Sequence, residues 1–358
     1  MQVPVRQSEV SVHKTEVIAP NFKKRLSGVT STIVQLIPLQ RREGLNIATM
    51  GPGLPADLPH LKWTAIFSFW SKPEKRNFRI WHARRNVEMI AGILMRDVLR
   101  MKLRLVFTSA AQRDHKPFTK WLIRRMNAVI ATSSRSGSFL KVPHTVIMHG
   151  VDLERFHPPV DQDDDFASSG LAGKYAIGCF GRVRHQKGTD LFVDAMIKLL
   201  PDYPEWTAVI TGRTTAEHQN FENDLKTRIA KAGLQDRILI LGEVPDIRVW
   251  YRRLTLYVAP SRNEGFGLTP LEAMASKTAV VASDAGAYAE MIIEGKTGSV
   301  VPAGDGNRLR EAIRPYLASP EVAQKHAEAA LLNTQKYFPL QREAASIREV
   351  YEQVFSQK

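Results

Sequence analysis

Two glutamates, Glu264 and Glu272, stand with seven residues between them in the most distinctive stretch of the sequence. The apolar run over residues 254–259 predicts a buried strand, and Thr269-Pro270 predicts the start of a helix. A strand that passes through glycines into a helix N-terminus directs backbone N–H groups outward, and anions bind at such a place. Carboxylates beside it accept hydrogen bonds from vicinal hydroxyls. The stretch therefore favours a ligand that carries both an anionic group and sugar hydroxyls.

The spacing of the two glutamates argues against the acid–base pair of a glycoside hydrolase. Eight positions along a helix span about 12 Å, whereas the carboxyl groups of such hydrolases stand about 5–9.5 Å apart. Glu264 precedes the predicted helix, so helix geometry does not fix its distance from Glu272. We expect the two carboxylates to hold two ends of one extended ligand. Glycines at 265 and 267 let that ligand approach the backbone closely.

Two cations, Arg182 and Lys187, follow another predicted strand at residues 175–180. A guanidinium binds phosphate oxygens in bidentate fashion, and an ammonium acts on them as a point charge. Neutralising the charge that develops on a departing nucleoside diphosphate is electrostatic catalysis and needs no metal. Either cation alone is ordinary surface charge, but beside the glutamate stretch the pair favours a diphosphate site.

Strands alternate with helices along the chain, which predicts an α/β fold built on mainly parallel sheets. Ligands of such sheets bind at the carboxyl ends of the strands. Trp81-His82 and the basic residues after it lie at such an end, where His82 is either a substrate contact or a structural histidine. Helices are expected at 86–101 and 116–126, among others. Strands are expected at 12–19, 46–50, 63–69, 78–82, 103–108, 128–132, 145–148, 175–180, 206–211, 238–241, 254–259 and 278–283.

The α/β pattern occurs twice, so we expect two domains, as the length of 358 residues also suggests. The boundaries are 1–155 for the first and 156–339 for the second, with a last helix in 340–358 crossing back to the first. Residues 155–174 contain prolines, serines and an acidic run at 161–165. A metal-binding Asp-x-Asp is possible there, but a solvated linker is the favoured interpretation because no strand holds the acids.

The composition, 44% hydrophobic and 24% charged, is that of a soluble globular protein. No uncharged apolar run approaches the roughly 20 residues of a spanning helix, and the N-terminus lacks a signal-peptide core. The single cysteine, Cys179, excludes an intrachain disulfide and indicates a reducing compartment. We expect a cytoplasmic protein.

Positive charge is concentrated in the first half of the chain. Residues 1–160 hold 26 Lys and Arg against 10 Asp and Glu, a net +16, while residues 161–358 hold 24 against 26, a net −2. This asymmetry favours an anionic partner for the first domain: nucleic acid, a membrane surface or an acidic substrate. A generally basic protein without such a partner is the alternative.

Together these motifs make the chain resemble the retaining glycosyltransferases of family 4, which have the GT-B fold and a Glu-x7-Glu motif. The resemblance covers nearly the whole chain. It implies two Rossmann-like, doubly wound domains that face each other across a cleft. It rests on Gly181-Arg182…Lys187-Gly188, Pro260-Ser261…Glu264-Gly265-Phe266-Gly267…Glu272-Ala273, Gly150-Val151-Asp152…Phe156 and Gly286…Glu290…Gly298.

The resemblance implies a role for each matching position. Glu264 would contact the donor sugar, Glu272 the ribose, and Arg182 with Lys187 the diphosphate. Further donor contacts would come from Gly28, Gly265, Phe266, Gly267 and Leu268, and His82 would lie near the anomeric carbon. Such enzymes are thought to transfer with retention by front-face attack, the leaving phosphate acting as base, without a metal or other cofactor. Two departures are Ser27-Gly28 in place of Gly-Gly, which weakens the expected diphosphate contact, and His149-Gly150 in place of Asn-Gly.

Within that family, two stretches of the first half resemble bacterial lipopolysaccharide core mannosyltransferases: residues 18–30 and Trp81-His82-Ala83-Arg84-Arg85-Asn86. The resemblance implies GDP-mannose as donor and an acidic Kdo residue on lipid A as acceptor, at the cytoplasmic face of the inner membrane. The basic first half suits such a polyanionic glycolipid. We expect acceptor contacts from Lys23, Lys24, Arg25, Arg84 and Arg85. The basic helix at 116–126 is either an interfacial helix of a peripheral membrane protein or an ordinary half-buried helix.

Two other functions remain open from the sequence. The same fold could use a UDP-hexose in capsule or exopolysaccharide synthesis. A binding protein for anionic lipid or nucleic acid would explain the basic half but not the glutamate stretch, and we find no nucleic-acid-binding motif.

Overall fold

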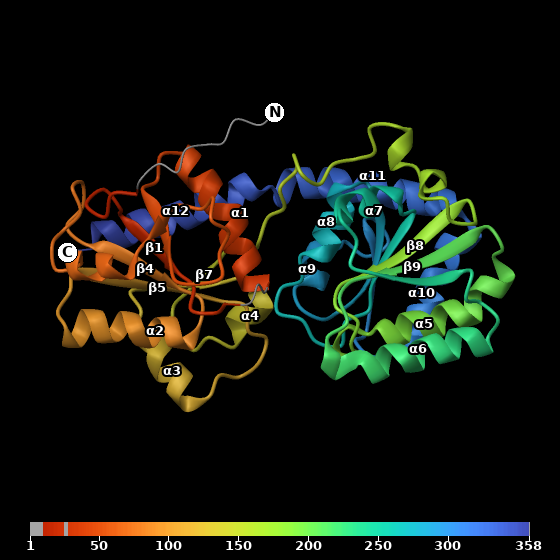
Figure 1. Ribbon diagram of the computed structural model, residues 1–358, viewed down its shortest axis with the longest axis horizontal. Helices are drawn as coiled ribbons and strands as arrows, with labels where there is room; N and C mark the ends of the chain where they lie inside the picture. The colour runs from red at the N-terminus through yellow and green to blue at the C-terminus, as the bar shows by residue number, and fades with distance from the viewer. Residues whose placement is uncertain (1–9, 25–27, 358) are drawn as a thin grey trace. The chain divides into compact units, whose positions relative to one another are not determined.

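The computed structural model describes residues 10–24 and 28–357, which form two compact units (Figure 1). The first unit comprises residues up to His149 together with Leu340 onward, and the second comprises Gly150–Pro339. The boundary expected from the sequence, 155/156, lies six residues further along the chain. In the described part of the chain, no helix is both long and apolar enough to cross a membrane.

The first unit is built on a seven-stranded parallel sheet in the order β3-β2-β1-β4-β5-β6-β7. Its central strands β1 and β4 are buried on both faces, as expected for a sheet covered by helices on each side. The strands are β1 (Val17–Pro20), β2 (Ile47–Met50), β3 (His60–Leu61), β4 (Arg79–Ala83), β5 (Leu103–Ser109), β6 (Ala128–Ala131) and β7 (Thr145–Val146).

Helices cover both faces of this sheet (Figure 1). On one face lie α1 (Gly28–Arg42) and α12 (Leu340–Ser356), whose Ile347 and Tyr351 are buried in the same core as Ile33. On the other lie α2 (Asn86–Ile93), a π-helical turn η2 (Leu94–Val98) and α3 (Pro117–Arg124). The remaining helical segments are η1 (Trp63–Ser68) and α4 (Ser134–Ser138).

The second unit has a six-stranded parallel sheet in the order β10-β9-β8-β11-β12-β13. Its strands are β8 (Tyr175–Phe180), β9 (Trp206–Thr211), β10 (Ile238–Gly242), β11 (Leu256–Ala259), β12 (Ala279–Ser283) and β13 (Gly298–Val301). Its helices are η3 (Gln162–Asp164), η4 (Phe166–Ser169), η5 (His185–Lys187), α5 (Thr189–Leu199), η6 (Leu200–Asp202), η7 (Ala216–His218), α6 (Gln219–Lys231), α7 (Ile247–Arg253), α8 (Thr269–Ala275), α9 (Tyr288–Met291), α10 (Gly306–Ala318) and α11 (Pro320–Tyr337). The expected pair of doubly wound α/β sheets is thus confirmed.

One predicted strand is wrong: residues 63–69 form the 3₁₀ helix η1 instead. The prediction rested on an apolar run, but Trp63 and Phe67 in it are 50% and 75% exposed. An apolar run indicates a buried strand only when its side chains enter the core, and these two side chains do not. The short β3 and the edge strand β13 were not among the predicted strands.

The acidic stretch at 161–165 is exposed, as expected for a solvated linker, except at Asp164, which is buried. Asp164 is only 4% exposed, and its carboxylate accepts a hydrogen bond from Arg252 of α7 at 2.6 Å. Arg253 donates to the backbone carbonyl of Asp163 at 2.8 Å. The stretch is therefore fastened to the second unit by two arginines of one helix.

Candidate functional site

The second unit presents a topological switch point between β8 and β11, where the strand order changes direction. Ligands of open α/β sheets bind beside the carboxyl ends of the two strands at such a point. The loop after β8 carries Arg182 and Lys187, and the loop after β11 carries Glu264. The predicted donor residues of both loops therefore meet at the edge where the topology directs a ligand.

Glycines bring the loop backbones together. Gly188 has φ +70°, and a Cβ there would stand 1.9 Å from the carbonyl oxygen of Pro260. Gly212, after β9, has φ +137°, and its Cβ would stand 1.9 Å from the carbonyl oxygen of Gly181. Only a residue without a side chain allows either approach. The loops after β8, β9 and β11 are therefore packed backbone against backbone.

An arginine clamp fixes the two main loops in register. Arg262 donates bidentately to the carboxylate of Asp190, at 2.7 Å for each bond, and to the carbonyl of His185 at 2.7 Å. Burial alone would raise the pKa of Asp190, but the bonds and charge of Arg262 outweigh it and the pKa is lowered. Asp190 lies in the first turn of α5, so the clamp ties that helix to the loop after β11.

Lys187 and Glu264 form an ion pair at the centre of this arrangement. Both side chains are about four-fifths buried, with 22% and 19% of their surface exposed. The ammonium has three N–H donors, and the carboxylate has lone pairs on both oxygens. One bond between them leaves the ammonium able to donate to a phosphate and the carboxylate able to accept from a hydroxyl.

The loop from Glu264 to α8 is shaped by a buried aromatic pair. Phe266 is buried, and its carbonyl accepts the backbone N–H of Ala287 at 3.0 Å. Gly267 has φ +88°, and a Cβ there would come within 2.2 Å of the ring of Tyr288. Gly265 and Leu268 are partly exposed on either side of this anchor, and Leu268 is the N-cap of α8. The predicted glycine loop is thus a rigid support that presents Glu264.

Glu272 lies one turn inside α8 and is half-buried. The hydroxyl of the buried Tyr251 donates to its carboxylate at 2.8 Å. Burial raises the pKa of Glu272, and the positive charges of Arg155 and Lys187 with the Tyr251 bond oppose that rise. The charge of Lys187 therefore affects both glutamates: the lysine forms an ion pair with Glu264 and opposes the rise in the pKa of Glu272.

Several residues that build this site were not predicted. Asp190, Arg262, Tyr251 and Tyr288 hold the loops or the glutamates, as described above. Their partners lie 21 to 72 positions away in the sequence, and no local motif reports such pairing.

The first unit has its own switch point between β1 and β4. Here the buried carboxylate of Glu88 accepts from the backbone N–H of Arg84 at 2.7 Å and from the side chain of Arg85 at 2.8 Å. Arg85 also donates to Asn21 at 2.7 Å and to Thr30 at 3.2 Å. Arg85 is therefore part of a buried network, while Arg84 is half-buried beside it. Their acceptor role stays a prediction.

His82 does not present a ring nitrogen to solvent. The side chain is fully buried, Nδ1 lies 2.6 Å from the hydroxyl of Tyr351 and Nε2 lies 2.7 Å from the hydroxyl of Thr108. Burial, reinforced by the charge of Arg84, holds the pKa of His82 well below its usual range. The neutral ring links β4 to β5 and to α12, and its expected role beside the anomeric carbon stays a prediction.

The remaining predicted residues of the first unit follow β1. Lys23 and Lys24 are exposed, and their carbonyls lie within 2.7 Å of where a Cβ on Gly53 would stand. Gly28 is the exposed first residue of α1. Arg25 lies outside the described residues, as does Ser27 of the Ser-Gly turn. Lys23 and Lys24 follow β1 at the carboxyl edge of the first sheet.

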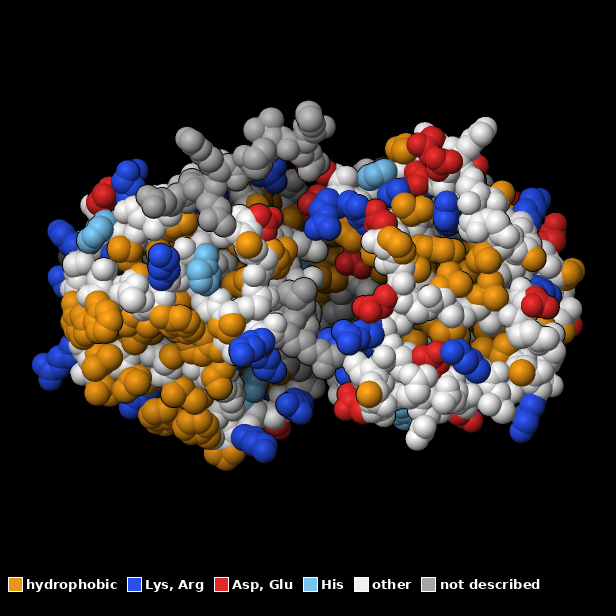
Figure 2. Space-filling view, viewed as in Figure 1, with side chains coloured by type: hydrophobic (Ala, Val, Ile, Leu, Met, Phe, Trp, Pro, Cys, Tyr) orange, Lys and Arg blue, Asp and Glu red, His pale blue; other side chains and the backbone are white. Residues whose placement is uncertain are grey.

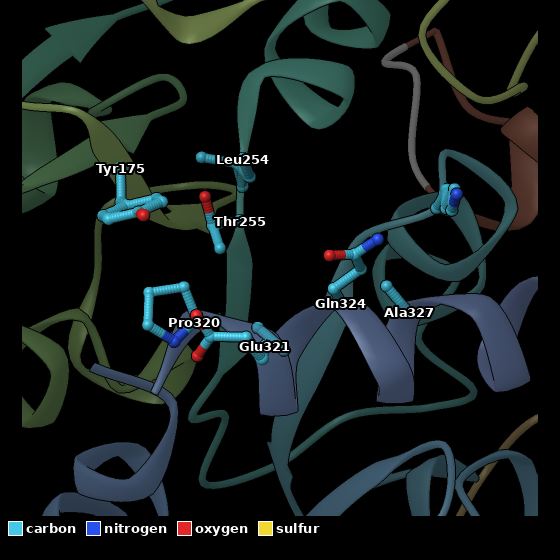
Figure 3. A pocket seen from close by; sticks show the side chains of 9 residues that line it. Tyr175, Leu254, Thr255, Pro320, Glu321, Gln324 and Ala327 are labelled. Atoms are coloured by element: carbon cyan, nitrogen blue, oxygen red, sulfur yellow. The ribbon is translucent and has the colours of Figure 1, made fainter. Parts of the chain in front are cut away.

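Other features of the second unit do not coincide with the donor residues. A hollow of about 290 Å³ lies at the opposite, amino end of β8, between that strand and α11 (Figure 3). Tyr175, Thr255, Glu321 and Gln324 line it. Burial raises the pKa of the Cys179 thiol to about 12, so this thiol stays protonated. The described residues contain no cluster of three or more His, Cys, Asp or Glu arranged to hold a metal.

The chain is similar in sequence to known glycosyltransferases. The sequence model of the family described as "Glycosyl transferases group 1" matches residues 161–332. The "Lipopolysaccharide core biosynthesis mannosyltransferase LpcC" of Rhizobium leguminosarum bv. viciae is 66% identical over 95% of this chain and 97% of its own. The corresponding LpsB of Rhizobium meliloti is 54% identical over 96% of this chain and 99% of its own.

A solved structure agrees on the architecture. The crystal structure of Anabaena Alr3699/HepE in complex with UDP and glucose covers 95% of this chain and all of its own, with a TM-score of 0.80 at 18% identity. At that identity the likeness concerns the fold alone. Both sheets of this chain therefore have counterparts in that structure.

Proposed function

Because this chain belongs to the group 1 glycosyltransferases, we propose that it transfers a mannosyl group from GDP-mannose to a Kdo residue of a lipopolysaccharide core on lipid A. The observation that carries the proposal is the Lys187–Glu264 pair at the β8/β11 switch point. The chain that contains this ion pair is 66% identical over 340 residues to a protein named as a lipopolysaccharide core mannosyltransferase.

The ion pair supports a donor site with two functions in one place. Glu264 accepts hydrogen bonds from sugar hydroxyls, while Lys187 donates its remaining N–H groups to the diphosphate. Arg182, at the carboxyl end of β8, adds a second cation beside the phosphates. Glu272 holds the ribose, with its carboxylate oriented by the Tyr251 hydroxyl. This division of contacts fits an extended nucleotide sugar and not a single monosaccharide.

We propose transfer with retention and without a metal. The bond from the anomeric carbon to the diphosphate oxygen breaks, and the electron pair leaves with the diphosphate. The acceptor hydroxyl attacks from the same face and gives its proton to the leaving phosphate. Lys187 and Arg182 offset the negative charge that develops on that phosphate, so preorganised cations supply the electrostatic stabilisation that a divalent ion would otherwise provide.

The charge of the first half supports an anionic acceptor. Residues 1–160 carry a net +16, and the exposed Lys23 and Lys24 follow β1 at the switch point of the first sheet. A Kdo residue on lipid A presents carboxylate and phosphate groups at the cytoplasmic face of the inner membrane, where we propose that the protein acts peripherally. Cations on flexible side chains attract such groups without demanding one geometry.

The test is release of GDP from GDP-mannose by the full chain, with Kdo-lipid A dispersed in detergent as acceptor. Turnover should persist in EDTA, and the product should carry an α-linked mannose, since GDP-mannose is an α-glycoside. Loss of turnover in EDTA that Mn²⁺ restores would overturn the metal-free mechanism. A β-linked product would overturn retention.

A second experiment distinguishes a GDP-sugar donor from a UDP-sugar donor. Thermal unfolding of the full chain is measured with GDP and with UDP at equal concentration, because a ligand that binds only the folded state raises Tm more when it binds more tightly. A larger rise with GDP is expected. A rise with UDP alone, together with transfer from UDP-glucose, would replace the proposal with a UDP-hexose transferase.

A further inference from the structure

The first unit carries a concentration of exposed apolar side chains. Of the fifteen large hydrophobic residues that are exposed in the described chain, ten lie between Trp63 and Trp121. Single exposed apolar residues are ordinary, but a cluster of this kind marks a contact surface. Figure 2 shows hydrophobic side chains gathered over the region of α2 and α3. The surface comprises Trp63, Phe67, Trp70, Val87, Ile90, Leu94, Val98, Leu99, Phe118 and Trp121.

The helix formed by α2 and η2 is apolar on both sides. Its inner side is buried in the core through Met89, Ile93 and Met95, as a surface helix requires. Its outer side carries a stripe of exposed apolar residues at helical spacing: Val87, Ile90, Leu94 and Val98. A helix that faces water normally has a polar outer side, so this stripe is built to meet a second apolar medium.

Contacts show that the neighbouring segments continue the same surface. The indole of Trp70 donates to the carbonyl of Leu99 at 2.7 Å, which joins the end of η1 to the end of η2. Asn86 of α2 donates to Thr119 of α3 at 2.7 Å, which joins the other end. On α3, the rings of Phe118 and Trp121 stack with centroids 5.9 Å apart.

Positive charge borders this apolar surface. Residues 86–126 hold nine Lys and Arg against three Asp and Glu. Of the three acids, Glu88 is buried with Arg85, Asp97 is paired with Arg96 at 2.6 Å, and Asp114 lies 3.6 Å from Lys120. The exposed cations that remain around α3 include Lys116 and Arg124. The surface therefore presents apolar and aromatic groups within a positive rim.

From this combination we infer that α2, η2, η1 and α3 form a membrane-contact surface that inserts into the interface of an anionic phospholipid bilayer. Tryptophan and phenylalanine are the side chains suited to the headgroup boundary, and lysine and arginine attract anionic lipids. A second copy of this chain suits the surface less well, because pairing two such faces brings like charges together. A bilayer has the complementary charge.

The position of the surface connects it with acceptor delivery. α2 begins at Asn86, directly after Arg84 and Arg85 at the carboxyl edge of the first sheet. The stripe starts at Val87 and runs away from that edge. A bilayer under α2 would thus hold a lipid headgroup beside the residues expected to bind it. The inference rests on the proposed function only in this choice of acceptor.

The test is flotation of the full chain with vesicles of phosphatidylcholine alone and of phosphatidylcholine with phosphatidylglycerol. Binding to the anionic vesicles is expected, weakened by added salt, with a blue shift of the fluorescence of the exposed tryptophans. The double variant Val98→Ser, Phe118→Ser should bind about tenfold less tightly or worse, because two apolar side chains no longer leave water. Both sites are more than half exposed, at 66% and 56%, so folding should be retained.

The matched control is Leu332→Ser, which removes a side chain 67% exposed on α11 of the second unit. It should bind vesicles like the parent chain. Equal binding by the double variant and the parent, or no binding to anionic vesicles, would overturn the inference. A third outcome would also overturn the inference: light scattering shows that the parent chain is a dimer, and the double variant is a monomer that still binds vesicles. The vesicles contain neither donor nor acceptor, so this outcome and that of the transfer assay are independent.

Discussion

The side chains of Lys187 and Glu264, 77 positions apart in the sequence, form an ion pair that joins the loops after β8 and β11. The pair is possible because Arg262 grips Asp190 and because Gly188 lets one loop reach the carbonyl of Pro260. A ligand at this point meets a cation and a carboxylate whose positions are fixed before it arrives. Preorganised charge of this kind stabilises a transition state without a cost of reorganisation.

Removal of the cation should abolish most activity. Lys187→Ala is expected to lower kcat by about 100-fold or more, the usual effect of removing one preorganised group that stabilises developing charge. The measurement is the initial rate of GDP release. Lys198→Ala, which removes an exposed lysine from α5, is the control and should keep the parent rate. Similar rates for both variants would remove Lys187 from the mechanism.

At Gly188, the effect on stability of the contact with Pro260 should be separable from the effect of backbone strain. Gly188 and Gly233 have almost the same φ, +70° and +68°, but only Gly188 has a backbone atom in the path of a Cβ. Alanine at either site strains the backbone, and at 188 it also displaces the loop after β11. We expect Gly188→Ala to cost about 2 kcal/mol more in free energy of unfolding than Gly233→Ala. Urea unfolding measures both; equal losses would contradict the packing described.

The buried His82 should make stability depend on pH. Its pKa is lowered in the folded state by burial, so below the ordinary histidine pKa of about 6.5 the unfolded chain binds a proton that the folded chain does not. Stability therefore falls as pH drops from about 7.5 to 5.5, by at most about 1.4 kcal/mol per pH unit from this residue. His82→Gln should flatten that slope in urea unfolding, and an unchanged slope would contradict this origin of the pH dependence.

The ionised carboxylate of Glu272 should lower the stability of the fold and strengthen nucleotide binding. Burial raises its pKa in the folded state, so above the ordinary glutamate pKa the ionised carboxylate disfavours folding, and this penalty grows as pH rises through the folded pKa. At neutral pH, Glu272→Gln is expected to raise Tm by about 2 °C. It should weaken nucleotide binding about tenfold, since a charged hydrogen-bond acceptor is lost. A lower Tm with unchanged affinity in calorimetry would contradict both expectations.

The sequence was sufficient for the two sheets because buried parallel strands are continuous apolar runs between helices. β8 and β9 have the predicted limits, Tyr175–Phe180 and Trp206–Thr211. It failed at η1, where apolar side chains face outward, and at β13, whose glycine and serine weaken the strand pattern.

For the site, the residue types and their loops were predictable, but their partners were not. Glu264 and Lys187 were singled out by their place after strands, whereas the Arg262–Asp190 clamp depends on two side chains 72 positions apart. His82 illustrates the opposite limit. The family resemblance predicts this residue near the anomeric carbon, but its hydrogen-bond partner Tyr351 lies 269 positions away, so the burial of the ring could not be predicted from the sequence.

The return of α12 to the first sheet sets an order of events during synthesis. Strand β1 leaves the ribosome early, but Ile347 and Tyr351, which complete its core, follow only after residues 150–339 have been made. At about 5–20 residues per second this interval is roughly 10–40 s. During it the first sheet lacks one covering helix, while the second unit, which is continuous, has all its strands. Until α12 arrives, the nascent first unit therefore exposes the apolar surface that Ile347 and Tyr351 later cover.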